Sequence, residues 1–278
     1  MKLAVISDIH SNLPALEAVL VDVDQWQPDW VVVAGDVVNR GPSPRECLQR
    51  IVEREKQDGW PFILGNHEEY VLVHTRPDAP REGIEFELLR YSYWTYQRLG
   101  PDIQYIQNLP FCVTLEDENV TLGFMTHASP LGTRDGLYPE TTDEELSTRI
   151  PDAVPLLAVG HTHRPFIRRV NGTLVVNAGA VGLPFDGDWR ASYARLQWND
   201  QQWHGEIHRV PYDRERAERD FYTTGFLEEA GPLARLILVE LQQARSLLYQ
   251  WTVAYRHRVL AGEMTLEESV DAFLREIS

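Results

Sequence analysis

The chain has 278 residues, of which 43% are hydrophobic and 24% charged, and its formal net charge is −16. This composition is typical of a folded globular protein, and the negative charge argues against extended contact with nucleic acid, which requires clustered Lys and Arg. No apolar run is long enough to span a membrane, no signal-peptide core follows Met1, and Cys47 and Cys112 offer no disulfide framework. We expect one large α/β domain in the cytoplasm, without a membrane or extended nucleic-acid partner.

The N-terminal part of the chain repeats one pattern, an apolar strand that ends in polar residues and leads into a helix. Apolar runs at residues 3–6, 30–34 and 61–64 predict three buried strands. Asn12 is suited to cap a helix after the first strand, and a second helix is expected from about residue 45 to 55. This order predicts parallel β-α-β units, in which functional residues collect beyond the carboxyl ends of the strands.

The middle of the chain is predicted to continue with helices and a hairpin. Residues 74–109 are rich in aromatic side chains and predict helices over one side of the strand ends. Residues 111–115 and 120–125 predict a hairpin across residues 116–119. A helix over residues 143–149 then leads into a buried strand that begins at Leu156.

Two further hairpins are predicted in the last part of the α/β region. Asn171-Gly172 is a strong turn signal between strands at 166–170 and 173–176, and strands at 192–197 and 205–210 flank Asn199-Asp200. We expect these hairpins to build a second sheet.

From residue 214 onward the apolar residues recur at helical spacing. Thr265 and Glu268 have the spacing of a capping box and mark the start of a last helix. These helices are expected either to cover the core or to form a dimerisation arm.

Polar residues gather where the predicted strands end. They are carboxylates, one amide and imidazoles: Asp8, His10, Asp36, Asn66, His67, His127, His161 and His163. His161 and His163 point the same way if the backbone stays extended, because side chains alternate along a strand. Nitrogen and oxygen ligands without a thiolate suit Mn, Fe, Ni or Zn better than Ca or Mg. Seven ligands and one further histidine are about what a two-metal hydrolase needs.

Five short motifs stand in the order that is usual for one known family. They are Asp8-Ile9-His10, Gly35-Asp36, Gly65-Asn66-His67-Glu68, Thr126-His127 and Gly160-His161-Thr162-His163. On these motifs the chain resembles the calcineurin-like metallophosphoesterases from about residue 1 to 210. The segment 177–194, with Pro184, Asp186, Gly187 and Arg190, is similar to the one that follows the last motif in bacterial phosphodiesterase-type members.

The resemblance implies the fold class. The fold would be an α/β, four-layer α-β-β-α sandwich of two mixed sheets. A metallophosphoesterase domain would cover residues 1–210, and a helical C-terminal extension, residues 211–278, would pack on the same domain.

The resemblance also implies a dinuclear metal centre. One ion would be held by Asp8, His10, Asp36 and His163, and the other by Asp36, Asn66, His127 and His161. Asp36 would be shared and would count as a catalytic residue with His67, which would protonate the leaving oxygen. The two ions, Mn before Fe, Ni or Zn, would lie about 3.5–4 Å apart and bridge the attacking hydroxide.

The loop after Asp36 differs in part from that of the phosphoprotein-phosphatase branch of this family. Asn39 stands where that branch has the aspartate that orients the acid histidine, so another group is needed to orient His67 or its pKa is raised less. Arg40 matches the arginine that clamps the phosphate in that branch. The alternative is that Arg40 only pairs with a surface carboxylate. The expected substrate contacts are Arg40, Asn66 and Arg134.

The expected function is hydrolysis of a phosphomonoester or phosphodiester of a small molecule or nucleotide. Protein serine/threonine phosphatase and dinucleoside polyphosphate hydrolase are the alternatives among enzymes, although Asn39 and Ala128-Ser129 favour the phosphodiesterase-like branch. A scaffold protein that keeps the fold is the alternative from another class. The expected partner is a small phosphorylated substrate, and a homodimer through the C-terminal helices stays open, as do the native metal and the role of those helices.

Overall fold

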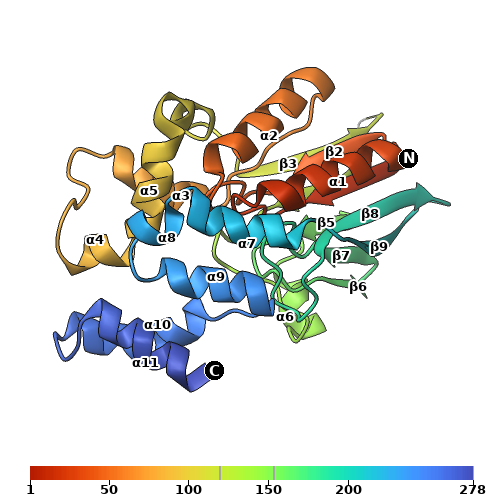
Figure 1. Cartoon of the computed structure of the whole chain (residues 1–278). Coiled ribbons are helices and arrows are strands. Elements are labelled where there is room, and N and C mark those ends of the chain that lie inside the picture. The colour runs from red at the N-terminus through yellow and green to blue at the C-terminus, as the bar shows by residue number, and fades with distance from the viewer. Residues whose placement is uncertain (119, 153, 278) are drawn as a thin grey trace.

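The computed structural model describes residues 1–118, 120–152 and 154–277, and it contains two β-sheets with helices outside them (Figure 1). Within these residues the strand order is β2-β1-β8-β9 in the first sheet and β3-β4-β5-β7-β6 in the second. Each sheet combines parallel and antiparallel strand pairs. This confirms the prediction of two mixed sheets.

The first sheet is built around the N-terminal strand. Its strands are β1 (Lys2–Ile6), β2 (Trp30–Val33), β8 (Ala191–Asn199) and β9 (Gln202–Val210). Strand β1 pairs with β2 in parallel and with β8 in the antiparallel direction. The connection between β1 and β2 is α1 (Leu13–Trp26), which begins where predicted because the Asn12 side chain accepts a hydrogen bond from the amide of Ala15.

The second sheet has β5 at its centre. Its strands are β3 (Cys112–Asp117), β4 (Val120–Thr126), β5 (Leu156–Val159), β6 (Phe166–Val170) and β7 (Thr173–Asn177). Strand β5 lies parallel to both β4 and β7, and the predicted hairpins β3-β4 and β6-β7 are confirmed. Asn119, the last residue of the predicted 116–119 turn, lies outside the described residues.

Two strand predictions are wrong. Residues 61–64 form one parallel bridge, Val33 to Phe62, instead of a strand, because Pro61 has no amide hydrogen with which to extend the pairing. The late hairpins do not build one sheet together, because β6-β7 joins the second sheet while β8-β9 joins the first. Local turn signals specify a hairpin, but the outer partner of each hairpin depends on contacts that are distant in sequence.

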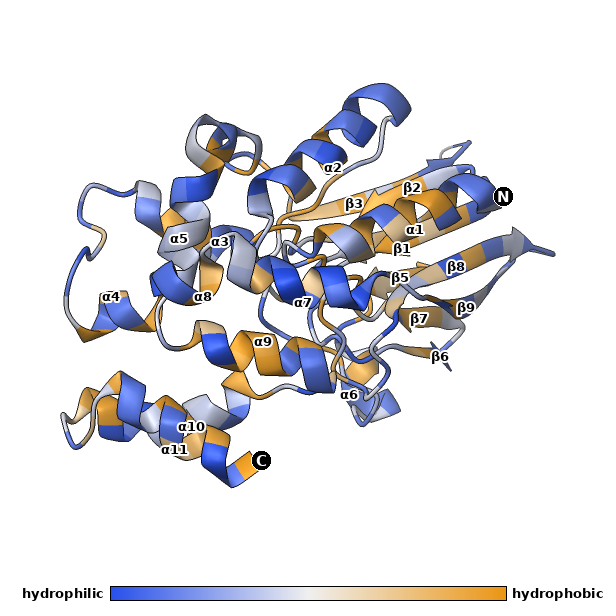
Figure 2. Ribbon diagram, viewed as in Figure 1, coloured by the Kyte–Doolittle hydropathy of each residue, from blue (hydrophilic) through white to orange (hydrophobic). Residues whose placement is uncertain are grey.

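Alternating side chains of the strands divide the core into layers. Leu3 and Val5 pack toward the second sheet, whereas Ala4 and Ile6 pack toward the helices. Between the sheets, Trp203 of β9 is fully buried, and its indole nitrogen donates a hydrogen bond of 2.6 Å to the carbonyl of Leu122 in β4. In Figure 2 strands β1 and β2 are coloured mainly in the hydrophobic range, as expected for strands buried on both faces.

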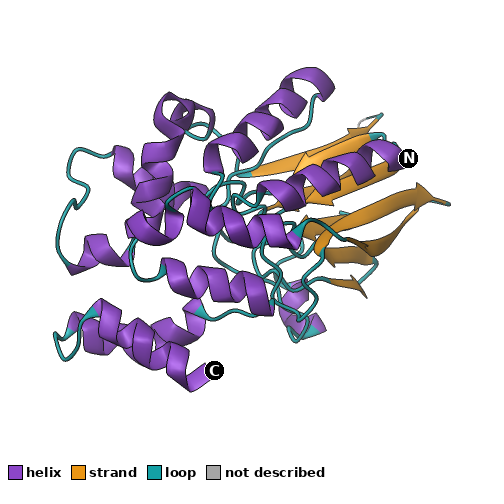
Figure 3. Ribbon diagram, viewed as in Figure 1, coloured by secondary structure: helices purple, strands orange, loops and turns teal. Residues whose placement is uncertain are grey.

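Helices form the outer layers (Figure 3). They are α2 (Pro44–Asp58), α3 (Asn66–Leu72), η1 (Val73–Thr75), α4 (Ile84–Leu88), α5 (Arg90–Leu99), η2 (Gly100–Tyr105) and α6 (Asp143–Ser147). The first sheet packs on α1 and α2, and the second sheet buries Leu157 and Val175 against Leu146 of the short α6. These contacts confirm the four-layer sandwich and the helices predicted within residues 74–109.

Among the described residues, the part of the chain after β9 forms five helices. They are α7 (Arg214–Thr223), α8 (Phe226–Glu229), α9 (Ala234–Gln243), α10 (Leu248–Leu260) and α11 (Leu266–Ile277). The predicted capping box at Thr265 and Glu268 precedes the last of them. Phe226 packs edge-on against Trp94 of α5 at 5.0 Å between ring centroids, so these helices share a hydrophobic core with the rest of the domain. Within the described part of the chain, every helix lacks the combination of length and apolar character needed to cross a bilayer.

His74 gives the fold a specific acid sensitivity. Both of its ring nitrogens are buried and have no hydrogen-bond partner in the described part of the chain, and its ring packs on those of Tyr93 and Tyr96. Burial, with a contribution from the charge of Arg81, lowers the pKa of His74 to about 4. In the unfolded chain the imidazole of His74 takes up a proton near pH 6.5, whereas in the folded protein it stays neutral until about pH 4. Protonation of the unfolded chain therefore lowers the free energy of unfolding as the pH falls from 6.5 toward 4, and has no effect above pH 6.5.

We therefore expect the free energy of unfolding to fall more steeply between pH 7.5 and pH 5 in the wild-type protein than in a His74→Phe variant. The wild-type protein should lose about 2 kcal/mol more than the variant between pH 7.5 and pH 5, because a group with a lowered pKa costs about 1.4 kcal/mol for each pH unit below 6.5. Urea unfolding at the two pH values measures it. Equal slopes in the two proteins would show that His74 titrates normally in the fold.

Candidate metal centre

The predicted ligands lie at one edge of the sandwich because the strands that precede them end there. Asp8 and His10 follow β1, Asp36 follows β2, and His127 follows β4. His161 and His163 follow β5, and Asn66 begins α3. The structure thus brings all seven residues together from five separate segments.

The backbone at these positions is not extended. Asp8, Asp36, His161 and His163 have positive φ angles of 56°, 54°, 69° and 56°. Non-glycine residues in this left-handed region are uncommon and concentrate at functional sites. The prediction that His161 and His163 point the same way assumed an extended backbone, and this backbone is not extended. The two rings have different partners: the ring of His163 contacts Asp8, and the ring of His161 contacts Asn66.

One group of side chains combines residues after β1, β2 and β5. Its members are Asp8, His10, Asp36 and His163, and one nitrogen or oxygen of each lies within 4.8 Å of the others. The Nε2 atoms of His10 and His163 are 3.0 Å apart. The Nε2 of His163 is 3.2 Å from Oδ1 of Asp8, and that of His10 is 3.7 Å from Oδ2 of Asp36.

A second group shares Asp36 with the first. His127 and His161 join Asp36 in a cluster of the same tightness. The Nε2 of His127 is 3.2 Å from Oδ2 of Asp36. Asn66 completes the group, because its Oδ1 lies 3.0 Å from His127 Nε2 and 2.9 Å from His161 Nδ1.

The two carboxylates are arranged to receive cations. Oδ2 of Asp8 accepts a 2.8 Å hydrogen bond from the amide of His161, and Oδ1 of Asp36 accepts one of 2.8 Å from the amide of His67. The other oxygen of each, Asp8 Oδ1 and Asp36 Oδ2, is buried and has no hydrogen-bond partner among the residues that the structure describes. Each of these oxygens faces an imidazole Nε2 at 3.2 Å. A buried carboxylate oxygen in that position is costly unless a cation binds it, so the donor set fits divalent metal ions.

Three of the imidazoles are fixed by backbone carbonyl groups. Nδ1 of His127 lies 2.8 Å from the carbonyl oxygen of Ala34, Nδ1 of His163 lies 2.5 Å from that of Leu183, and Nδ1 of His10 lies 3.3 Å from that of Asn39. A carbonyl only accepts, so the neutral form of each ring carries its proton on Nδ1 and turns the Nε2 lone pair toward the cluster. This arrangement is the usual support of metal-binding histidines.

Burial and neighbouring charges shift the pKa of three of the candidate ligand histidines. Burial lowers the pKa of His10 well below its usual range, and His163 and His67 add to the effect. Burial likewise lowers the pKa of His161 to about 4. Burial acts in the same direction at His127, but the adjacent Asp36 outweighs it and raises the pKa to about 10. A metal ion at Asp36 would therefore displace a proton from His127.

His67 is hydrogen-bonded by Asn39, the residue that replaces the aspartate of the phosphoprotein-phosphatase branch. Nδ2 of Asn39 lies 3.0 Å from Nδ1 of His67. The amide of Asn39 is oriented by its oxygen, which accepts hydrogen bonds from the backbone of Arg40 and the hydroxyl of Thr95. Asn39 therefore donates to Nδ1, and the proton of the neutral His67 ring lies on Nε2. The pKa of His67 is well below its usual range, chiefly because of burial.

Glu68 organises the site, a role that the sequence analysis missed. Its Oε2 accepts hydrogen bonds from the amides of Asp36 and Gly65 at 2.8 and 3.0 Å, and its Oε1 accepts from Val37 and Val38 at 2.8 and 3.2 Å. The carboxylate thus ties the loop after β2 to the start of α3. Burial raises its pKa to about 7, with a contribution from Asp36. The sequence did offer one indication of this role, because Glu68 directly follows Asn66 and His67 in the same motif.

Close approach of the strand ends requires two of the motif glycines. A Cβ atom at Gly65 would lie 2.1 Å from Oδ1 of Asp36, and one at Gly160 would lie 2.0 Å from Oγ of Ser7 and 2.4 Å from Oδ2 of Asp8. All three distances are far below van der Waals contact. These glycines therefore let the loops that carry the ligands meet.

The two predicted substrate-binding arginines have different surroundings. Arg40 is buried and forms an ion pair with Glu240 of α9. The side chain of Arg134 is 51% exposed, pairs with Glu69 at 2.6 Å and lies over the ring of Tyr70 at 5.0 Å. Tyr70 in turn packs against His67 at 5.3 Å, so Arg134 lies near the outer side of the site.

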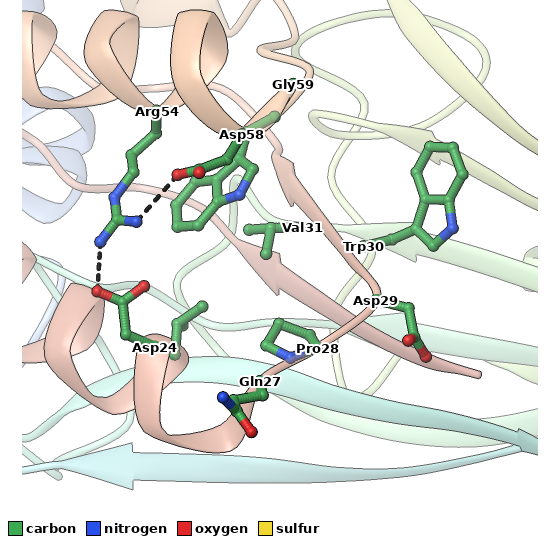
Figure 4. A pocket seen from close by; sticks show the side chains of 11 residues that line it. Asp24, Gln27, Pro28, Asp29, Trp30, Val31, Arg54, Asp58 and Gly59 are labelled. Carbon is green, nitrogen blue, oxygen red and sulfur yellow. Dashed lines mark hydrogen bonds and ion pairs between the residues drawn. The ribbon is translucent and has the colours of Figure 1, made fainter.

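A pocket of about 490 Å³ lies elsewhere, between the C-terminal ends of α1 and α2 and the segment that enters β2 (Figure 4). Its cation, Arg54, is already paired with Asp24 and Asp58 and packs over Trp60 at 4.9 Å. The pocket adjoins the amino end of β2, opposite the metal-ligand cluster. It takes no part in the candidate site.

Comparison with known proteins identifies the family. Residues 1–201 match the sequence model of the calcineurin-like phosphoesterase superfamily domain. The chain belongs to this superfamily. This membership confirms the predicted resemblance and the prediction of a metal-dependent phosphoric ester hydrolase.

Individual proteins are similar to this chain over most of its length. An uncharacterized protein of Methanocaldococcus jannaschii is 29% identical over 235 residues, which cover 77% of this chain and 89% of that protein. Phosphodiesterase YfcE of Escherichia coli K12 is 28% identical over 207 residues, covering 70% and 87%. The crystal structure of a metallophosphoesterase from Sphaerobacter thermophilus superimposes with a TM-score of 0.69 at 29% identity, covering 88% of this chain and all of that one.

Proposed function

We propose that this phosphoesterase uses two divalent metal ions to hydrolyse phosphomonoesters or phosphodiesters of small molecules or nucleotides. The observation that carries the proposal is the convergence of two ligand groups on Asp36, with one carboxylate oxygen of Asp8 and one of Asp36 buried against imidazole nitrogens. The similarity to phosphodiesterase YfcE supports the diester part of the proposal.

The ligand assignment follows the two groups. Asp8, His10, Asp36 and His163 would hold one ion, and Asp36, Asn66, His127 and His161 the other. The mixed nitrogen and oxygen donors favour Mn, with Fe, Ni or Zn as alternatives. Two bound ions would supply a nucleophile at neutral pH by lowering the pKa of water, and would neutralise charge on the phosphate oxygens.

The protein's own groups complete the chemistry. His67 would protonate the leaving oxygen from Nε2 in its imidazolium form, and the ring would return to neutral. In the imidazolium form Nδ1 also carries a proton, so the Asn39 amide would present its oxygen to Nδ1. Arg40 and Arg134 would contact the phosphate or the group attached to it. The division into residues 1–210 and a helical extension, residues 211–278, and action in the cytoplasm are parts of the same proposal.

A substrate screen on the metal-loaded protein tests the function. It would compare nitrophenyl phosphate, its bis-ester, cyclic nucleotides, dinucleoside polyphosphates and phosphopeptides with each metal in turn. Preference for the bis-ester or nucleotides supports the proposal, whereas preference for phosphopeptides would identify a protein phosphatase. Absence of turnover on every substrate with every metal would support a scaffold instead.

The His67→Gln variant separates catalysis from metal binding. We expect it to retain both metal ions and to lower turnover by about 10²- to 10⁴-fold, because general acid catalysis contributes on that scale. Metal analysis and kinetics on nitrophenyl phosphate measure the two effects. His208→Gln is a matched control, since His208 lies on β9 beside Asp22. Hydrolysis by His67→Gln at the wild-type rate would show that His67 is not the proton donor.

A homodimer through the C-terminal helices remains part of the proposal. Three side chains on α10 are exposed despite their apolar character, namely Tyr249, Val253 and Leu260, at 70%, 63% and 42%. The spacing of Tyr249 and Val253 places them on one face of the helix. This face would be the contact with a second copy.

A further inference from the structure

A buried ion pair joins the last helices to the loop that carries Asn39. Arg40 pairs with Oε2 of Glu240, which lies on α9 and is fully buried. The other oxygen, Oε1, accepts hydrogen bonds of 2.8 Å from the amides of both Leu247 and Leu248 at the start of α10. Glu240 is therefore fixed by the backbone of the helical extension, and its remaining oxygen fixes Arg40.

Arg40 lies beside the candidate metal centre. The centre of its guanidinium is 5.6 Å from the ring of Phe185, and this ring stacks on that of His163 with 4.3 Å between centroids. Arg40 also directly follows Asn39, which hydrogen-bonds to His67. Its positive charge contributes, after burial, to the lowered pKa of His10 and of His67. The cation is thus close to the ligands of the first group and to the proposed proton donor.

The guanidinium has donor capacity that the protein does not use. Glu240 accepts from Nη2, whereas Nε is buried and has no hydrogen-bond partner among the described residues. A buried donor without an acceptor is costly, and an arginine presents its donors in a fork that matches phosphate oxygens. Because Nε is closed off from solvent here, a phosphoryl group would supply the missing acceptor when substrate binding turns the guanidinium toward the metal centre.

Stability alone does not account for the pair. A buried ion pair gains little over well-packed apolar side chains, because both ions must lose their hydration. Glu240 would also be a costly choice for a helix that only had to cover a hydrophobic core. A role in holding the cation in place accounts for both the charge and its burial.

We propose that Glu240 is a positioning residue that holds the Arg40 guanidinium in the active site so that it donates hydrogen bonds to the phosphoryl oxygens of the substrate. This inference rests on the proposed function of the metal centre and assigns to the helical extension, residues 211–278, a part in substrate recognition. Glu240 itself touches no reacting atom. Its effect on binding passes entirely through Arg40.

Binding of inorganic phosphate to the manganese-loaded protein tests this without turnover. Calorimetry would compare the wild type, Arg40→Met, Glu240→Gln and the double variant. We expect Arg40→Met to weaken phosphate binding about tenfold or more, as expected for loss of a hydrogen bond to a charged group. Glu240→Gln should weaken it several-fold, and in the Arg40→Met background it should add nothing. The manganese content should not change.

The kinetic counterpart distinguishes positioning from a purely structural role. For nitrophenyl phosphate, Glu240→Gln should raise KM in proportion to its effect on phosphate binding. Glu229→Gln is the matched control, because Glu229 also joins the extension to an arginine of the domain, Arg98 at 2.8 Å, but its side chain is 54% exposed. The control should leave KM and phosphate affinity unchanged.

Each outcome decides the inference. Glu240→Gln leaves Arg40 unpaired and could therefore fail to fold. In that case the Arg40→Met variant is compared with the double variant. Equal phosphate affinities of the two support the positioning role of Glu240, and unequal affinities overturn it. If the wild type hydrolyses esters but Glu240→Gln binds phosphate normally, the inference fails and the proposed function stands. If phosphate binding depends on Glu240 but no ester is hydrolysed, only the proposed function fails. A wild type that neither binds phosphate nor hydrolyses esters overturns both.

Discussion

An Asp36→Asn variant is expected to lose both metal ions and, with them, the hydrolysis of phosphate esters. Asp36 belongs to both ligand groups, and its buried Oδ2 lies 3.2 Å from Nε2 of His127 and 3.7 Å from Nε2 of His10. Because partners that merely orient metal ligands are worth about 10- to 100-fold in affinity, loss of a shared charged ligand should cost at least about 100-fold at each position. Elemental analysis after dialysis and kinetics on nitrophenyl phosphate measure the two losses.

The fold should survive this substitution. The asparagine retains the oxygen that accepts the amide of His67, so the start of α3 stays attached. Asp22→Asn provides a control, since Asp22 pairs with Tyr193 and Arg195 outside the cluster. Full metal content in Asp36→Asn, or activity that persists without metal, would contradict the two-metal proposal.

A Glu68→Gln variant is expected to lose stability and metal affinity together. The wild-type carboxylate accepts four backbone amides, two on each oxygen. The glutamine amide group would face two of these donors with donors of its own, and two unsatisfied buried amides cost roughly 2–6 kcal/mol. The loops that carry Asp36 and Asn66 would separate, which should lower metal affinity by about 10- to 100-fold.

Urea unfolding of the metal-free protein and a manganese titration measure these effects separately. Glu69→Gln is the matched control, because Glu69 is the next residue on α3 and its side chain is 32% exposed in a pair with Arg134. An exposed pair of this kind contributes about 0–1 kcal/mol. Wild-type stability and metal affinity in Glu68→Gln would show that the four amide contacts do not organise the site.

The metal-ligand candidates could be found in the sequence because each follows an apolar run. Strands that are buried on both faces are near-continuous hydrophobic segments, and parallel strands place their carboxyl ends at one edge. Asp8, Asp36 and His127 therefore stand out without any knowledge of the pairing. The five ordered motifs added the family, which the match over residues 1–201 confirms.

The orientation of these side chains was not readable from spacing. An extended backbone was the basis for expecting His161 and His163 to point the same way, yet both adopt left-handed φ angles. Likewise, Asn39 was expected to leave His67 without its usual support, but the amide reaches Nδ1 directly. Such contacts depend on loops that close in three dimensions, where a rotation of one residue redirects a side chain.

The sequence by itself determined the local elements, the polar residues at the strand ends and the family, because hydrophobic period, turn residues and motif order are local properties of the chain. Only the tertiary structure decided which sheet each late hairpin joins, and that Glu68 and Glu240 are buried beneath the site. Glu240 is 200 residues from Arg40 along the chain, and no local pattern marks the pair. Which residues pair over such a distance in sequence depends on how the helices and sheets pack together. A charged group can be buried only where the packed fold places an opposite charge beside it.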